Sequence, residues 1–366
     1  MIAAKEKITA GQFMIVVIQA QIGVGILFLP SSVESVARND AWISILLAGM
    51  AALLLSVVMW GLNRRFPTMT LFEFLPKLLG KFAGKIVQIF YGLAFILECS
   101  MVLVLFTDVV RDWIFPITPR WVILGLMLAT ALYMARENIR LIARFFVLTF
   151  GLIFVLILIA AYAYKDANIL YILPINESGI SNVLKGMLRS MNSLYGFEMI
   201  LLCYPYVKGG SKGILKATLF ACVFSTLVYS FMVFMCLIVF SPEELKIIPQ
   251  PVLYMVKALS FTVIERADLY FLTIWTVVVI TTVMAYLYMG AKAVASIFGK
   301  KKHAGAVPYV ALLILCISLY PHDQELINKM QIIVGIIAAI ALVVLPFLLL
   351  CISYLFRIKG KEGAEG

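Results

Sequence analysis

Long apolar stretches separated by short polar segments run through the whole chain. A helix that crosses a bilayer needs about 20 mostly apolar residues. On this measure we expect ten membrane-spanning helices and a single polytopic membrane domain covering residues 1–366. The expected spans lie at 10–30, 41–62, 83–110, 120–135, 141–164, 183–207, 216–240, 267–298, 307–321 and 331–356. The pattern therefore predicts an all-α integral membrane protein. Between the seventh and eighth spans, residues 241–266 form a wider loop in which we expect one or two short surface helices.

Composition supports this class. Hydrophobic residues make up 63% of the chain and charged residues 13%, a balance that would leave a soluble domain with an apolar surface. The first apolar stretch is followed by many others and lacks a small-residue cleavage site, so we expect a membrane helix and not a removable signal peptide. The six cysteines all fall in apolar stretches without metal-ligand spacing, which predicts free thiols packed as small hydrophobic groups.

The distribution of basic residues predicts orientation. With a cytoplasmic N-terminus, 20 of the 30 lysines and arginines fall in cytoplasmic loops and span ends. Cytoplasmic loops of membrane proteins carry such an excess. We therefore expect both termini in the cytoplasm, with residues 357–366 as a cytoplasmic tail that is disordered from Lys359 onward. The net charge of +11 then reflects membrane topology, and no nucleic acid partner is expected.

Two expected helices carry glycines where an intact helix would be disfavoured. The first contains Gly23-Val24-Gly25 and the sixth contains Tyr195-Gly196-Phe197. Ten spans divide into two halves of five, residues 1–164 and 183–356, and an odd number per half places the halves in opposite orientations. The two interrupted helices then occupy corresponding places. Such a pair in an inverted repeat indicates a binding site near the bilayer midplane.

An unwound helix exposes backbone groups that lipid cannot satisfy, so a ligand, water or protein must satisfy them. Amides at the start of a half-helix attract a carboxylate, and freed carbonyls attract an ammonium group. Two adjacent breaks therefore predict a site for an α-amino acid. The candidate ligand-binding residues are Gly23, Val24, Gly25, Ile26, Tyr195, Gly196, Phe197 and Glu198. The alternative is that the glycines only allow close packing of neighbouring helices.

Two acidic residues lie deep in apolar spans, Glu98 and Glu198. A charge at the bilayer centre costs at least about 2.5 kcal/mol, so such residues usually face a cavity or a partner. Glu198 adjoins the second break, where it can bind a coupling proton, a ligand amine or the freed amides of its own helix. Glu98 can line the ligand path or form a hydrogen bond between helices.

Four further polar residues are candidates for the pocket or its access path. Gln19 and Gln21 precede the first break, and at most one of them can face the cavity because residues two apart lie on different helix faces. Thr281 and Thr282 can offer hydroxyls to a cation near the first break, or can bond to their own helix backbone.

No enzyme constellation is present in the sequence. The two histidines, His303 and His322, fall in loops on opposite sides of the expected membrane, and Walker, dinucleotide-binding and zinc-protease motifs are absent. We therefore expect no catalysis, no cofactor, no metal site and no ATP-driven pumping.

The two breaks resemble a known superfamily. Gly23-Val24-Gly25-Ile26 and Tyr195-Gly196-Phe197-Glu198 are similar to the motifs that interrupt the first and sixth helices of amino acid–polyamine–organocation (APC) transporters. Ten spans and the opening Lys7–Phe13 resemble a narrower group, the spore germination permease-like family of germinant receptor B subunits. The resemblance implies a LeuT-like fold in a receptor subunit of the inner spore membrane. It also implies a nutrient ligand such as L-alanine, and partnership with a second membrane subunit and a lipoprotein.

One departure separates the chain from part of that superfamily. Several proton-coupled members carry a lysine within the fifth helix, whereas this chain has only Arg144 at the cytoplasmic end of its fifth span. The difference favours a sensing subunit. Two alternatives remain open, a proton- or sodium-coupled secondary amino acid transporter and a ligand-gated conduit for water or ions, because all three functions need the same fold.

Overall fold

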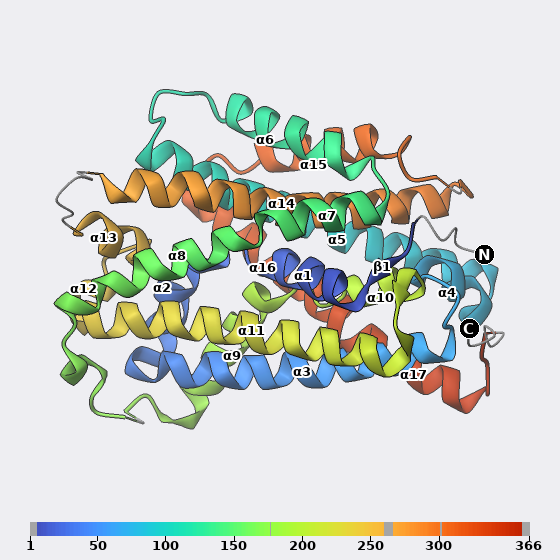
Figure 1. Ribbon diagram of the computed structural model, residues 1–366, viewed down its shortest axis with the longest axis horizontal. Helices are drawn as coiled ribbons and strands as arrows, with labels where there is room; N and C mark the ends of the chain where they lie inside the picture. The colour runs from blue at the N-terminus through green and yellow to red at the C-terminus, as the bar shows by residue number, and fades with distance from the viewer. Residues whose placement is uncertain (1–5, 176, 260–265, 301, 361–366) are drawn as a thin grey trace.

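The computed structural model describes residues 6–175, 177–259, 266–300 and 302–360. Its helices run mostly along the long axis of the molecule (Figure 1). The part of the chain up to residue 172 forms β1 (Ile8–Thr9), α1 (Ala10–Gln21), α2 (Gly25–Ala37), η2 (Arg38–Asp40), α3 (Ala41–Arg65), α4 (Leu71–Leu79), α5 (Lys81–Trp113), α6 (Arg120–Ala135), α7 (Ile139–Thr149), α8 (Gly151–Tyr162), η3 (Ala163–Asp166) and η4 (Ile169–Ile172).

The remainder of the described chain has a similar helical content. It forms α9 (Gly179–Leu194), α10 (Met199–Cys203), η5 (Tyr204–Tyr206), β2 (Val207–Lys208), α11 (Gly210–Val239), α12 (Pro242–Leu245), α13 (Pro251–Lys257), α14 (Ala267–Ile297), α15 (Val307–Leu319), α16 (Gln324–Ala339), the π-helical turn η6 (Ile340–Val344) and α17 (Leu345–Leu355).

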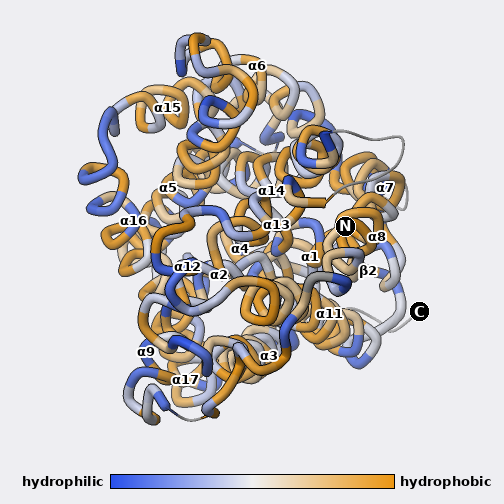
Figure 2. The backbone as a smooth tube through the Cα atoms, turned by 90° about the vertical axis from the view of Figure 1, so that its left-hand side faces the viewer, coloured by the Kyte–Doolittle hydropathy of each residue, from blue (hydrophilic) through white to orange (hydrophobic). Residues whose placement is uncertain are grey.

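Each expected span coincides with one helix or with consecutive helices. Among the residues that the structure describes, six helical stretches are long and apolar enough to cross a membrane, and they include α5, α11 and α14. The shorter apolar helices α1, α6 and α15 occupy three more of the expected positions. Large apolar side chains also point outward, among them Leu54, Leu126 and Leu158, as lipid contact requires. Figure 2, a view along the long axis, shows hydrophobic residues in the helices at the periphery of the bundle as well as in its interior. The exact number of crossings stays a prediction.

The interrupted N-terminal helix lies inside the bundle. α1 packs against α7, α11 and α14, while α2 packs against α9 and α13. A capping box between Thr9 and Gln12 starts α1, and the short strand before it pairs in parallel with β2, Ile8 opposite Val207. The strand pair ties the beginning of the chain to the segment that follows α10.

The two described chain ends lie at the same end of the molecule (Figure 1). The Arg65 guanidinium donates to the Ser353 and Ile358 carbonyls, at 2.8 and 3.1 Å, and the Gly360 N–H donates to the Arg65 carbonyl at 2.8 Å. The start of the tail is therefore held against α3, so the expectation of disorder from Lys359 onward is wrong for residues 359 and 360. Residues 361–366, for which disorder was also expected, lie outside the described residues.

Two helices depart from the sequence analysis. α4 was not expected; a capping box between Thr70 and Glu73 starts it, and it packs against α5. α13 was expected at the surface, but it buries Val252, Leu253 and Val256 against α2 and α14. Its apolar residues recur at helical spacing, so one face can enter the core. Residues 260–265 of the same loop lie outside the described residues. All six cysteines are free, and four of them are buried.

Candidate functional site

The first helix break separates α1 from α2 at residues 22–24. The Ile22 N–H still bonds to the Ile18 carbonyl, but its ψ angle of 107° takes the backbone out of the helix. In the described part of the chain, the N–H groups of Val24 and Gly25 have no hydrogen-bond acceptor. They lie at the N-terminus of α2, where the helix dipole is positive. This end of the break can therefore bind a carboxylate.

Side chains from neighbouring helices bind the carbonyl groups released by the first break. The Tyr229 hydroxyl donates to the Gln21 carbonyl at 2.8 Å, and the Trp275 indole N–H donates to the Gly23 carbonyl at 3.3 Å. The Thr282 hydroxyl lies 3.0 Å from the Gln19 carbonyl and 3.1 Å from the Ile22 carbonyl. The break is thus stabilised on one side by α11 and α14.

The second break separates α9 from α10 at residues 195–198. Gly196 has a φ angle of +127°, which side-chain-bearing residues rarely adopt. The fully buried Glu198 bridges this break, because its Oε2 accepts from the Gly196 N–H at 2.6 Å and its Oε1 accepts from the Tyr286 hydroxyl at 2.8 Å. Of the roles considered for Glu198, the geometry shows the binding of a freed amide within its own helix.

The two breaks lie directly against each other. A Cβ atom on Gly196 would lie 2.6 Å from the Gln21 nitrogen, and one on Gly25 would lie 2.8 Å from the Ser193 Cβ atom. The Gln21 amide Nε2 donates to the Leu194 carbonyl at the end of α9, at 2.6 Å. The glycines therefore permit both the unwinding and the close approach of the helices. The interpretation of the glycines as helix breaks and the interpretation as packing sites are thus compatible.

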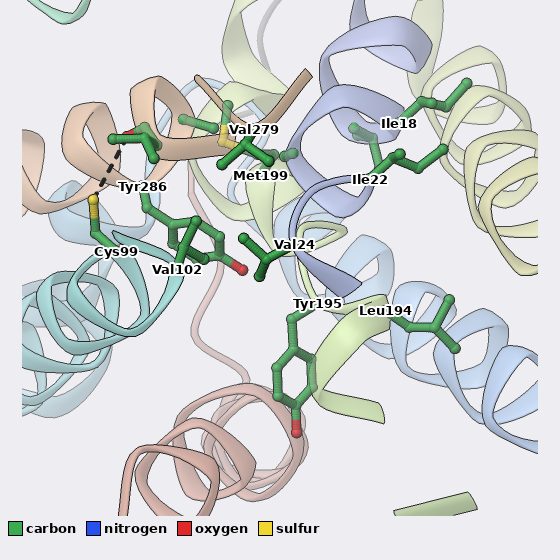
Figure 3. Packing of buried hydrophobic residues seen from close by; sticks show 14 of the residues in the cluster. Ile18, Ile22, Val24, Cys99, Val102, Leu194, Tyr195, Met199, Val279 and Tyr286 are labelled. Carbon is green, nitrogen blue, oxygen red and sulfur yellow. Dashed lines mark hydrogen bonds between the residues drawn. The ribbon is translucent and has the colours of Figure 1, made fainter. Parts of the chain in front are cut away.

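A cavity of about 700 Å³ opens beside the breaks. Its walls come from α1, α2, α5, α9, α11, α14, α16 and η6, which include the third, eighth and tenth expected spans. Figure 3 shows Tyr286 and Tyr195 on either side of Val24, with Val102 of α5 nearby. The positive end of α2 and the negative end of α9, where Asn192 and Ser193 lie, both border the cavity.

Seven of the residues singled out from sequence line this cavity. They are Gln21, Gly23, Val24, Gly25, Glu98, Tyr195 and Thr282. The other six are packed behind its wall: Gln19, Ile26, Gly196, Phe197, Glu198 and Thr281. Gln19 faces away from the cavity, because its Nε2 donates to the Phe146 carbonyl and the Thr149 hydroxyl of α7, at 3.2 and 3.0 Å.

Oxygen atoms gather where α14 meets the first break. The Thr281 hydroxyl lies 2.6 Å from the Val278 carbonyl and 3.3 Å from the Gln19 carbonyl. Together with the two contacts of Thr282, five oxygen atoms lie close to one another. They are the carbonyl oxygens of Gln19, Ile22 and Val278 and the hydroxyl oxygens of Thr281 and Thr282. Hydroxyl and carbonyl oxygens are ligands that hard cations prefer.

Several residues of the site were not expected from the sequence. Tyr286, Tyr229 and Trp275 hold the breaks in place, although each lies in an apolar span where an aromatic residue usually indicates packing. The π-helical turn η6 contributes Val343 to the cavity wall. Such turns recur at functional sites, but they leave no clear pattern in a uniformly apolar sequence.

Comparison with known proteins places the chain in a family. Residues 7–327 match the family model described as "Spore germination protein". The chain is 27% identical over 319 residues to spore germination protein GerQB of Bacillus cereus, covering 86% of this chain and 87% of that protein. It is 26% identical over 372 residues to spore germination protein YndE of Bacillus subtilis (strain 168), covering 99% and 100% of the two chains.

Solved structures show the fold. MhsT, crystallised in complex with L-phenylalanine, matches with a TM-score of 0.72 at 14% identity, covering 95% of this chain and 89% of that chain. Mhp1, a nucleobase-cation-symport-1 family transporter, matches with a TM-score of 0.67 at 13% identity, covering 96% and 80%. These neighbours confirm the expected LeuT-like fold. Because the family match spans most of the chain, this multi-pass membrane protein belongs to the spore germination protein family.

Proposed function

We propose that this protein is the membrane subunit of a spore germinant receptor. In this proposal it binds a small nutrient, an L-amino acid such as L-alanine, beside the interrupted helices, and the bound ligand triggers germination. The observation that carries the proposal is the cavity of about 700 Å³ between the unbonded amides of Val24 and Gly25 and the C-terminal end of α9. A zwitterion matches this arrangement, with its carboxylate at α2 and its ammonium group on the opposite side.

The family membership supports a role in germination but does not identify the ligand, which we infer from the cavity. By the same proposal the protein resides in the inner spore membrane with both termini in the cytoplasm. It acts there with a second membrane subunit and a lipoprotein. Binding of the ligand then changes the packing of the interrupted helices, and the partner subunits respond to this change in conformation.

Binding and counterflow on the purified protein test this proposal. We expect saturable binding of labelled L-alanine, or of another amino acid from a small panel, without sustained exchange in liposomes that hold only this protein. Exchange above that of empty liposomes would show intrinsic transport. Ligand-dependent swelling or conductance would instead show a conduit. Absence of both binding and exchange for every amino acid would contradict the proposal.

A secondary transporter is the second candidate, and one observation favours it. A monovalent cation could bind beside the first break, where five oxygens lie close together, those of Gln19, Ile22, Val278, Thr281 and Thr282. Uptake of L-alanine driven by an imposed sodium gradient, and absent with potassium on both sides, would support sodium-coupled transport over sensing.

A further inference from the structure

The face of α5 that borders the cavity carries an acidic residue. Glu98, Met101, Val102 and Leu105 follow the spacing of one helix face, and all four line the cavity. The Glu98 residue is only 9% exposed, and the rest of this face is apolar. The carboxyl group is therefore held at the cavity wall, largely removed from solvent.

Glu98 has no partner among the described residues. Its carboxyl group accepts no hydrogen bond there, in contrast to Glu198, which accepts from Gly196 and Tyr286. The other charged residue that lines the cavity is Arg189, but its guanidinium donates to the Ser32 carbonyl and the Ser35 hydroxyl, at 3.1 and 2.8 Å. A buried acid without a partner is costly in a membrane protein and usually marks a pathway or a ligand contact.

Two aromatic rings border the same space. Tyr195 and Tyr286 both line the cavity, on either side of Val24 (Figure 3). Aromatic faces attract cations through the quadrupole of the ring. No described lysine or arginine lies over either of these two rings. An acid and two rings without a cation of their own together form a site for a positively charged group.

We propose that Glu98 binds the ammonium group of the ligand and makes a primary amine a requirement for recognition. This inference rests on the proposed function for the cavity and deepens it. The carboxylate of the ligand binds at the amides of Val24 and Gly25, while its ammonium group binds Glu98 beside the tyrosine rings. The apolar residues Met101, Val102 and Leu105 then contact the side chain of the ligand.

The test compares probes that differ by one charged group. Wild-type protein in lipid nanodiscs is titrated with L-alanine, L-leucine, propionate and ethylamine. We expect the amino acids to bind, ethylamine to compete weakly and propionate not to compete. In Glu98→Gln we expect the affinity for amino acids to fall by at least about tenfold, because a charge-assisted hydrogen bond is lost. Glu98→Asp keeps the charge and should retain part of the affinity.

A matched control is Glu34→Gln. Glu34 is a buried acid of α2 that does not line the cavity, so its variant should bind the amino acids like wild type. Equal affinity of wild type and Glu98→Gln for L-alanine would overturn the inference. Competition by propionate as strong as that by L-alanine would overturn it as well, and this comparison needs no variant if Glu98→Gln fails to fold.

The panel separates this inference from the proposed function. If wild type binds no amino acid but binds ethylamine in a manner that Glu98→Gln abolishes, the amino acid proposal fails and the role of Glu98 stands. If wild type binds the amino acids and Glu98→Gln binds them equally well, the proposed function stands and the role of Glu98 fails. If no amine of any kind binds to wild type, both fail.

Discussion

At the scale of single residues, the site depends on glycines that leave no room for a side chain. Gly196 combines a positive φ angle with backbone contact to α1, and Gly25 faces Ser193 across the gap between the two interrupted helices. A larger residue at either position must push two backbones apart. The backbone groups that the proposed ligand contacts would then move with them.

We expect Gly25→Val and Gly196→Leu to abolish amino acid binding while the protein still inserts in the membrane. The added side-chain atoms meet Ser193 and the Gln21 backbone at distances that real contacts do not reach. Binding to protein purified from membranes measures the effect. Gly125→Val is a suitable control, because a Cβ atom on this glycine of α6 meets nothing within 4 Å. Wild-type affinity in both site variants would remove the breaks from the binding site.

Thr282→Val should destabilise the protein although it keeps the size of the side chain. The Thr282 hydroxyl lies within hydrogen-bond distance of two carbonyls freed by the break, those of Gln19 and Ile22. Valine has no hydroxyl, and a buried acceptor left unsatisfied costs about 1–3 kcal/mol. A lower midpoint of thermal unfolding in detergent would show this. Thr273→Val, at an exposed position of the same helix, should leave the midpoint unchanged. An equal shift in both variants would contradict the prediction.

At the scale of elements, α14 connects the cavity to one end of the bundle. Its middle carries Thr282 and Tyr286, which hold the breaks, and further along Lys292 lies over the rings of Tyr206 and Tyr288. The loop that follows places His303 edge-on to Tyr288, with ring centroids 4.8 Å apart, and its Nε2 lies 3.0 Å from the Ala135 carbonyl of α6. The loop thereby fastens α14 to α6.

The environment of His303 predicts a pH dependence. Burial, together with the charge of Lys292, lowers the pKa of this imidazole to about 4. The folded pKa lies below the unfolded value of about 6.5, so the unfolded state binds more protons and the folded state loses stability as pH falls from about 6.5 toward 4. At pH 5 the free energy of unfolding is lower by about 2 kcal/mol because of this histidine.

We expect His303→Gln to reduce the loss of stability between pH 7.5 and pH 5 by about that amount, as measured by denaturant unfolding in detergent. His322→Gln is the matched control for the loss of a histidine, since the His322 side chain is largely exposed. If the pH dependence of His303→Gln equals that of wild type, the buried imidazole is not the source of the acid sensitivity.

At the scale of the whole molecule, both described chain ends lie at the end opposite α12 (Figure 1). The excess of basic residues predicts that the end with the termini faces the cytoplasm. The fold alone does not impose this orientation, because large apolar side chains such as Leu54, Leu126 and Leu158 are exposed on several helices of the bundle. The distribution of charged residues in the segments outside the membrane must therefore determine the orientation.

Cysteine labelling in intact cells tests the orientation. With the exposed Cys316 and Cys351 replaced by serine, Lys246→Cys near α12 should react with a membrane-impermeant maleimide, because it faces outward in the predicted topology. Lys300→Cys, beyond the other end of α14, should react only after permeabilisation. The reverse pattern would show that the termini face outward.

The sequence alone determined the class, the expected spans and the two positions of helix interruption. These features are local: about 20 apolar residues fill a bilayer core, and the motifs Gly23-Val24-Gly25 and Tyr195-Gly196-Phe197 disfavour a continuous helix at their own positions. The amphipathic α4 was missed because it is too short for the membrane-span criterion. A short helix was expected at the position of α13, but its burial was not.

Only the tertiary structure decided which candidates share the cavity. Gln19 and Gln21 are two residues apart, yet one bonds to α7 and the other borders the cavity. Glu98 and Glu198 are both acids in apolar spans, but Glu198 bridges its own helix break while Glu98 has no partner among the described residues. The physical reason is that the rotation of each helix follows from packing against several neighbours, and in a chain that is apolar on all sides the residue pattern does not specify that rotation.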